Sequence, residues 1–300
     1  MTRALAGVLA PVVTTFDPES GELAPVPFRA NIRAHVAAGL SGVVVAGSTG
    51  EAPLLEEAER AQLVDWARPL LPDDRWLIVG AGGESTRLTI ARARQAAERG
   101  GDAILVVAPH YFGSAMTPEA LATHFRRVAD ESPIPVILYN IPKYTHFALD
   151  PGLVMELSRH QNIIGIKDSA GELKQLGAYL ESQSERFTVL TGHGGSFYPA
   201  LEMGARGGIL AVALFAGHVA QELCASFAAG DKPRAGRAQG RLTPLAKEIV
   251  AGLGVAGVKA AMDAVGLQGG SVRPPLLPLR PAALERVSEL LREAHVSRAA

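Results

Sequence analysis

Residues 162–169 read Asn-Ile-Ile-Gly-Ile-Lys-Asp-Ser, and the rest of the chain is best interpreted outward from this stretch. Three isoleucines within four positions give high β-propensity and no polar face, which is typical of a strand buried on both sides in a parallel sheet. The strand carries an amine, Lys167, to its end. That lysine either extends past the strand into solvent or lies in an apolar pocket, where the ammonium form is disfavoured and the free amine attacks carbonyl carbons. Alone, a motif this short favours the first alternative.

The sequence on both sides of this strand alternates between short apolar runs and helical patterns. Glycines end several of the helices just before the next strand, as expected of residues that turn a helix end sharply. Eight such strands predict a (β/α)8 TIM barrel, an α/β fold. An open doubly wound sheet is disfavoured, because Thr-Phe-Asp-Pro at 15–18 does not resemble the G-x-G-x-x-G fingerprint expected after its first strand. The predicted strands are 7–14, 42–46, 76–79, 103–107, 135–139, the stretch ending at 167, 187–190 and 208–212, and the predicted helices include 27–38, 55–71 and 85–98, with further helices beginning near 117 and 150.

The pattern becomes wholly helical after residue 216. This is more helix than an eighth barrel helix requires, and no flexible or low-complexity linker precedes it. We therefore predict a catalytic barrel over 1–220 and a C-terminal helical extension over 221–300 that packs on it as part of a single unit. The predicted helices of the extension are 221–229, 234–251, 255–265 and 281–294.

Composition excludes several classes of protein. Of 300 residues, 48% are hydrophobic and 20% are charged, so the chain can build a large core. The net charge of -1 supplies no field that would attract nucleic acid or an anionic membrane. The single cysteine, Cys224, excludes an internal disulfide and a cysteine-based metal cluster. With no apolar run of membrane-spanning length and an N-terminal apolar stretch too short for an export signal, we expect a soluble, cytoplasmic protein.

In a barrel of this kind the active site lies where the strands end. The second strand is followed by Gly-Ser-Thr-Gly-Glu at 47–51, where the hydroxyls of Ser48 and Thr49 and the backbone amides up to Gly50 suit a small carboxylate. A plain glycine-rich turn would have the same sequence. Taken by itself, the turn favours that simpler interpretation.

Two further strand ends carry groups whose chemistry is complementary. Tyr139 and Lys167 are one β/α unit apart, so their side chains are expected at neighbouring positions on the rim. An amine that attacks a carbonyl needs protons moved on and off oxygen, which a tyrosine hydroxyl can do. Tyr139 could instead simply close a core strand. Because Ser48, Thr49, Tyr111, Tyr139 and Lys167 all fall at strand ends, a shared site is the better hypothesis.

Three motifs together give the chain a resemblance to a known family. Residues 47–51, Tyr-Asn-Ile-Pro at 139–142 and Gly-Ile-Lys-Asp-Ser at 165–169 look like those of the dihydrodipicolinate synthase/N-acetylneuraminate lyase family, over nearly the whole chain from about 7 to 278. The resemblance implies a pyruvate-type Schiff-base aldolase or lyase on a (β/α)8 barrel with C-terminal helices. It also implies a homotetramer, a dimer of dimers, without a metal or another cofactor.

The resemblance also implies roles for individual residues. Lys167 would form the imine with the 2-oxo acid, and Tyr139 would be the proton shuttle. Tyr111 matches a tyrosine that reaches across a dimer interface to support the proton relay, and Ile209 matches a residue whose backbone lies beside pyruvate. The implied catalytic set is Lys167, Tyr139, Tyr111 and Thr49, and the implied substrate-binding set is Ser48, Thr49, Gly50 and Ile209.

The motifs indicate less clearly which activity within this family the chain has. The lysine-biosynthesis synthase, which condenses pyruvate with aspartate semialdehyde, normally has an arginine where this chain has Tyr144, although the neighbouring Lys143 could compensate. Sialic acid lyases usually carry an acidic pair in the segment that here reads Thr-Gly-His-Gly-Gly at 191–195. The leading hypothesis is reversible cleavage of a 4-hydroxy-2-oxo acid, of the 4-hydroxy-2-oxoglutarate or 2-keto-3-deoxy sugar acid type, to pyruvate and an aldehyde. Stretches at 83–86, 129–136 and 254–259 resemble 4-hydroxy-2-oxoglutarate aldolases.

Two rival classes remain. A phosphate-handling barrel would use the glycines at 192–195 and 207–208, and a 2-oxo-acid-binding effector barrel would bind without catalysis. Neither gives the Lys167 amine a task. Three histidines near strand ends, His110, His146 and His193, are candidates for contact with substrate.

Overall fold

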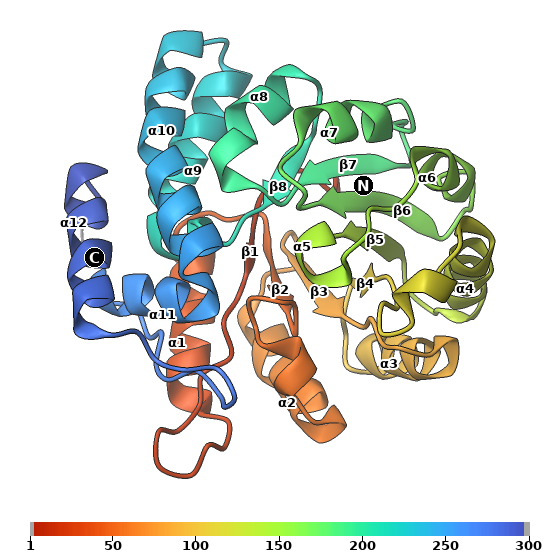
Figure 1. Ribbon diagram of the computed structural model, residues 1–300, viewed down its shortest axis with the longest axis horizontal. Coiled ribbons are helices and arrows are strands. Elements are labelled where there is room, and N and C mark those ends of the chain that lie inside the picture. The colour runs from red at the N-terminus through yellow and green to blue at the C-terminus, as the bar shows by residue number, and fades with distance from the viewer. Residues whose placement is uncertain (1–2, 297–300) are drawn as a thin grey trace.

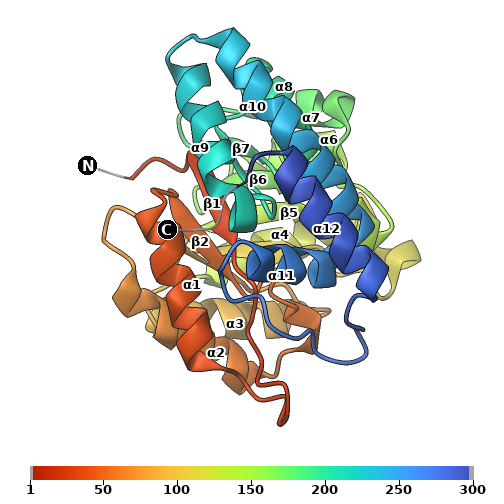
Figure 2. The same cartoon turned by 90° about the vertical axis from the view of Figure 1, so that its left-hand side faces the viewer.

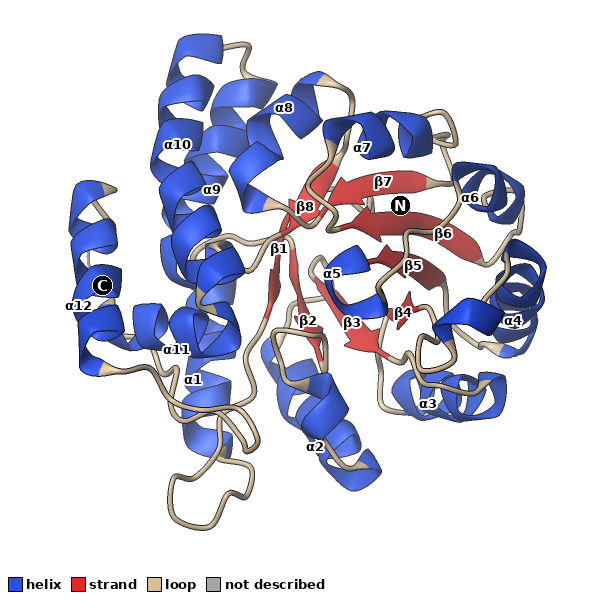
Figure 3. Cartoon of the chain, viewed as in Figure 1, coloured by secondary structure: helices blue, strands red, loops and turns tan. Residues whose placement is uncertain are grey.

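Eight parallel strands pair in chain order and close on themselves, β1 with β2 through to β8 with β1. This computed structural model describes residues 3–296, so the outermost parts of the two predicted units, 1–2 and 297–300, lie outside the described residues. Figures 1 and 3 show the strands in the centre with helices around them. The strands are β1 Gly7–Pro11, β2 Gly42–Val45, β3 Trp76–Gly80, β4 Ala103–Val107, β5 Val136–Asn140, β6 Ile163–Asp168, β7 Thr188–Thr191 and β8 Gly207–Ile209. The predicted (β/α)8 TIM barrel with C-terminal helices is confirmed.

The helices of the barrel follow the strands they connect. Side-chain caps begin three of them where the sequence predicts, with Ser85, Thr117 and Asp150 each accepting a hydrogen bond from a first-turn amide. These helices are α1 Pro25–Ala37, α2 Glu57–Ala67, α3 Thr86–Glu98, α4 Pro118–Glu131, α5 Pro142–Thr145, α6 Pro151–Leu157, α7 Leu173–Leu180 and α8 Phe197–Glu202.

The C-terminal helices gather on one side of the barrel, together with α1 (Figure 2). They are α9 Ala213–Ala228, α10 Lys232–Pro244, α11 Gly254–Ala264 and α12 Pro281–Glu293. The division predicted at 220/221 falls inside α9, so one helix both completes the barrel and begins the extension. The division into two units stays a prediction.

Several predicted boundaries are wrong for identifiable reasons. The helix expected over 234–251 changes at Pro244 into a π-helix, Leu245–Gly252, because proline supplies no amide to the helical hydrogen-bond ladder. The helix expected over 55–71 is an α-helix only to Ala67, and a 3-10 turn containing Pro69 follows it. The first strand ends at Pro11 instead of 14, and the eighth ends at Ile209 instead of 212.

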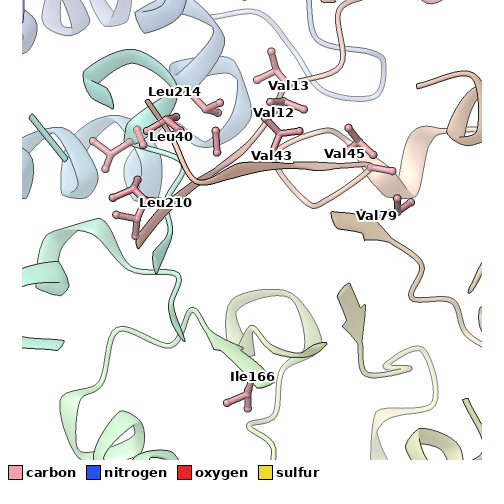
Figure 4. Close-up of a cluster of buried hydrophobic side chains, with 14 of the residues drawn as sticks. Val12, Val13, Leu40, Val43, Val45, Val79, Ile166, Leu210 and Leu214 are labelled. Carbon is pink, nitrogen blue, oxygen red and sulfur yellow. The ribbon is translucent and has the colours of Figure 1, made fainter. Parts of the chain in front are cut away.

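Alternating side chains divide the core into two layers. On β2, Val43 and Val45 pack outward against the helices (Figure 4), while Val44 belongs to the cluster inside the barrel. This is the period-two alternation of any strand, with both faces apolar because both are covered. The inner cluster also contains Tyr139 and Ile209, which places two predicted site residues inside the barrel.

No helix within residues 3–296 is long and apolar enough to cross a membrane. Over the same residues, no group of three or more His, Cys, Asp or Glu side chains is placed to hold a metal ion.

Candidate active site

Lys167 and Tyr139 lie directly opposite each other on β6 and β5. Both residues are only 5% exposed, and the Lys167 Nζ is 4.3 Å from the centre of the Tyr139 ring. The sequence placed these side chains at neighbouring rim positions, and the structure confirms that placement. Within the residues described, the Tyr139 hydroxyl has no hydrogen-bond partner, so it is free to exchange protons with a substrate at the amine.

Gly192, just after β7, makes the space that the lysine occupies. A Cβ on this glycine would lie 2.7 Å from Lys167 Cε and 1.9 Å from Ser169 Oγ. The Gly192 amide donates a 2.6 Å hydrogen bond to the carbonyl of Asp168, which draws the end of β7 against the end of β6. Sequence reasoning missed this residue, because a glycine needed for a long-range approach resembles any turn glycine.

Asn140 and Asp168 fix the two strands that carry the reactive pair. Asn140 Nδ2 donates a 2.7 Å hydrogen bond to Asp168 Oδ1, and Asn140 Oδ1 accepts another from the Leu149 amide. Burial raises the pKa of Asp168, and the bonds from Asn140 and the Ala170 amide oppose that shift. Both residues belong to the motifs, but no sequence pattern predicted that they would pair. In the structure this pair holds β5 in register with β6.

The turn at 47–51 has free hydrogen-bonding capacity. Among the described residues, the hydroxyls and amides of Ser48 and Thr49 and the amide of Gly50 find no protein acceptor. Thr14 Oγ1 donates a 2.6 Å hydrogen bond to the Gly50 carbonyl, so this end of the turn is fixed while its donors stay available. Such an arrangement of donors suits a carboxylate.

The turn ends in a residue with an unusual backbone conformation. Glu51 has φ +58°, in the left-handed region that non-glycine residues rarely adopt. Its buried carboxylate forms a 2.6 Å ion pair with Lys259 of α11. Burial lowers the pKa of Lys259, and the adjacent Glu51 carboxylate opposes that shift. Sequence reasoning assigned Glu51 no partner.

Tyr111 does not join the buried pair within this chain. Its side chain is 79% exposed and packs edge-on against Phe112, which is 69% exposed, with ring centres 5.0 Å apart. Two backbone hydrogen bonds to Glu84, from His110 and Tyr111, hold the segment in place. Two adjacent exposed aromatic rings are typical of a surface that meets a partner.

The other rim candidates differ in their environment. His193 is half-buried beside Gly171, and burial lowers its pKa, opposed by Asp168. Tyr144 is 42% exposed, and its pKa is raised by burial and by the nearby Tyr139. His146 is exposed, and His110 faces Glu84. Lys143 donates a hydrogen bond to the Ala251 carbonyl, and its Nζ lies 5.8 Å from the centre of the Tyr144 ring.

Two glycines of the phosphate-barrel alternative, Gly207 and Gly208, have a structural explanation. A Cβ on Gly207 would lie 2.1 Å from the Gly7 carbonyl oxygen, and one on Gly208 would lie 3.0 Å from the Thr191 carbonyl oxygen. Glycine is therefore needed where β8 closes the barrel between β7 and β1. These residues give no support to a phosphate site.

A (β/α)8 barrel with a buried lysine facing a tyrosine, beside a turn of free amides and hydroxyls, defines a class: barrels equipped for imine chemistry on a 2-oxo acid. Comparison with known proteins agrees. Residues 4–294 match the model of the dihydrodipicolinate synthetase family, and the chain belongs to that family. It is accordingly an enzyme, a pyruvate-dependent lyase of the class I aldolase type.

Named relatives and solved structures support this membership. The chain is 34% identical to a 4-hydroxy-tetrahydrodipicolinate synthase of Methanothrix thermoacetophila, over 91% of each chain. It is 38% identical to 4-hydroxy-tetrahydrodipicolinate synthase 1 of Streptomyces coelicolor, over 80% of this chain and 78% of the relative. An Escherichia coli K12 prophage protein of the dihydrodipicolinic acid synthase family, solved with pyruvate, superposes with a TM-score of 0.91 at 29% identity, covering 97% of this chain and 99% of its own.

Proposed function

We propose that the enzyme cleaves a 4-hydroxy-2-oxo acid reversibly to pyruvate and an aldehyde through an imine on Lys167. The observation that carries the proposal is the buried amine of Lys167, 4.3 Å from the ring centre of the equally buried Tyr139. The turn at 48–50 supplies donors for the carboxylate of the 2-oxo acid, and Ile209 forms part of the inner wall on which that acid rests. Thr49 of the same chain, together with Tyr111 from a second copy of the chain, would extend the proton path from Tyr139.

The reaction follows from the positions of these groups. The Lys167 amine attacks C2 of the 2-oxo acid, and Tyr139 returns protons to the leaving oxygen as water is lost. With the protonated imine in place, the C4 hydroxyl gives its proton to the oxygen of deprotonated Tyr139, and the C3–C4 bond breaks. The electron pair of that bond moves into the imine, which releases the aldehyde and leaves an enamine. Protonation at C3 and hydrolysis then release pyruvate and the free amine.

The residues bordering the pair favour an aldehyde without a carboxylate. Tyr144 occupies the position where the family's synthase has an arginine, and His193, whose pKa burial lowers, is neutral at pH 7. Lys143 is bound to a backbone carbonyl. Because Tyr144 replaces the arginine and the Lys143 ammonium is engaged by the Ala251 carbonyl, we expect substrates of the 2-keto-3-deoxy sugar acid type to fit better than 4-hydroxy-2-oxoglutarate. The names of the relatives support the alternative, 4-hydroxy-tetrahydrodipicolinate synthase with aspartate semialdehyde.

The first experiment is intact-mass spectrometry after borohydride reduction with pyruvate, followed by peptide mapping. A reduced pyruvate adduct on Lys167, absent from the Lys167→Ala variant, is the expected result. No adduct at saturating pyruvate would contradict the proposal and favour the effector-binding barrel. Turnover of 2-keto-3-deoxy sugar acids is then compared with condensation of aspartate semialdehyde, and faster condensation would establish the synthase instead.

We also propose a cytoplasmic homotetramer, built as a dimer of dimers, with the Tyr111–Phe112 pair at one interface. The support is the exposure of both rings, since exposed neighbouring aromatics are enriched at interfaces. One structure with a TM-score of 0.91 and 27% identity, covering 97% of each chain, is described as a monomeric variant of dihydrodipicolinate synthase.

A further inference from the structure

We propose that the buried ion pair between Glu51 and Lys259 positions the 48–50 turn, so that helix α11 helps to set the affinity for the 2-oxo acid. The inference rests on the proposed function, in which this turn binds the carboxylate of pyruvate. Neither Glu51 nor Lys259 touches the reacting atoms. Both are positioning residues.

The Glu51 carboxylate is engaged on both oxygens. Oε1 lies 2.6 Å from Lys259 Nζ, and Oε2 accepts a 2.8 Å hydrogen bond from the Arg273 amide. The side chains of Glu51 and Lys259 are 0% and 1% exposed, so bulk solvent does not screen the interaction. These two partners therefore offset the free-energy cost of burying the charge of the carboxylate.

Lys259 is itself held by the C-terminal segment. Its Nζ donates a 2.6 Å hydrogen bond to the Ser271 carbonyl and lies 4.7 Å from the centre of the Phe16 ring. The segment carrying Ser271 is tied down in turn, since Asn31 both donates to and accepts from the backbone of Gln268. The position of the amine is thus fixed by contacts that do not involve the 48–50 turn.

Backbone conformation connects this pair to the turn. A left-handed φ at a glutamate costs free energy and persists only where surrounding contacts enforce it. The ion pair fixes the turn just after Gly50, while the Thr14 hydroxyl fixes the Gly50 carbonyl from the other side. If the ion pair is lost, Glu51 can leave the left-handed region, and the free amides and hydroxyls at 48–50 lose their common alignment. Lys167 and Tyr139, on other strands, keep theirs.

The expected effect is therefore on affinity and not on imine chemistry. We would titrate pyruvate against borohydride-trapped adduct for the wild type and for Lys259→Met, which removes the charge but keeps an apolar chain of similar length. The half-saturating pyruvate concentration should rise about 10-fold or more. The limiting rate of adduct formation on Lys167 at saturating pyruvate should change less than about threefold.

A matched control separates the ion pair from the stability of the helix. Met262→Ala also truncates a fully buried side chain of α11, but Met262 forms no part of the Glu51 contacts. It should destabilise the protein and leave half-saturation near the wild-type value. An equal rise in Met262→Ala would overturn the inference, because the effect would then follow from loosened helix packing. Unchanged half-saturation in a folded Lys259→Met protein would overturn it directly.

Two further variants keep the test decisive if Lys259→Met does not fold. Glu51→Gln removes the charge and retains an acceptor for the Arg273 amide, and it should raise half-saturation in the same direction. The double variant Glu51→Gln/Lys259→Met removes both charges and should bind pyruvate better than Lys259→Met alone, or fold where that variant does not. An unchanged Glu51→Gln titration overturns the inference. A wild-type protein that gives no adduct at all contradicts the proposed function, which is a different outcome.

Discussion

Replacing Gly192 with alanine should disable Lys167 while leaving the barrel folded. The added Cβ would lie 2.7 Å from Lys167 Cε, whereas ordinary van der Waals contact begins at 3.4 Å. The lysine must therefore retreat by about 0.7 Å, the difference between these two distances, because the backbone of Gly192 is tied to the Asp168 carbonyl. Ser169 Oγ, 1.9 Å from the new atom, must rotate away as well.

The size of the effect follows from how sharply reaction rate depends on position. A displacement of about 1 Å at a reacting group costs on the order of 100-fold in rate, so a shift of this size predicts a loss of about 10- to 100-fold. Overpacking of this kind lowers the free energy of unfolding by about 1–3 kcal/mol, which a barrel of this size can tolerate.

The assay is the rate of borohydride-trapped adduct formation on Lys167 at saturating pyruvate, with urea unfolding measured in parallel. Gly195→Ala is the matched control from the same segment, because the atoms nearest to its Cβ belong to the His193 ring, at 3.0 Å or more, and not to Lys167. That control should trap pyruvate at close to the wild-type rate. If Gly192→Ala also traps at the wild-type rate, Lys167 has more freedom than the structure gives it, and the reasoning about the pocket fails.

Two other predictions concern pH and assembly. His35 and His124 are buried, and burial lowers the pKa of each to about 4 from the usual 6.5. Because the unfolded chain binds these protons below pH 6.5 and the folded chain does not, the free energy of unfolding should fall as pH drops from 6.5 to 4, by up to about 3 kcal/mol per histidine. In His35→Gln, the free energy of unfolding measured with urea should fall less steeply between pH 6.5 and 4 than in the wild type. The same pH dependence in both proteins would refute the low pKa of His35. Phe112→Ser should shift sedimentation toward smaller species, with no shift expected if the Tyr111–Phe112 pair lies outside the interfaces.

Much of the fold was predictable because it is encoded locally. Most strands are short β-branched or aliphatic runs, and some helices begin at a capping residue such as Ser85 or Thr117. The helix boundaries that failed involve prolines, at 69 and 244, where the chain continues in a tighter or wider helix instead of stopping. Local patterns do not distinguish these outcomes, because packing of the following residues decides between them.

The reactive pair was predictable for a related reason. Parallel strands that are consecutive in a barrel are neighbours, so Tyr139 and Lys167 at corresponding strand ends had to lie side by side once the barrel was recognised. The free donors of the 48–50 turn were suggested by composition alone. The exposure of Tyr111 did not follow from any local pattern, because exposure depends on what covers a loop; only the family resemblance implied a place for Tyr111 at a dimer interface.

The sequence by itself therefore determined the barrel, the order of its strands and the pairing of Lys167 with Tyr139, since these follow from short-range periodicity and fixed strand order. Only the tertiary structure decided which glycine makes room for the lysine, and which cation compensates Glu51. Gly192 and Lys259 approach their partners from distant parts of the chain. Their positions depend on how whole helices and strands pack to bury apolar surface, a property that no local pattern contains.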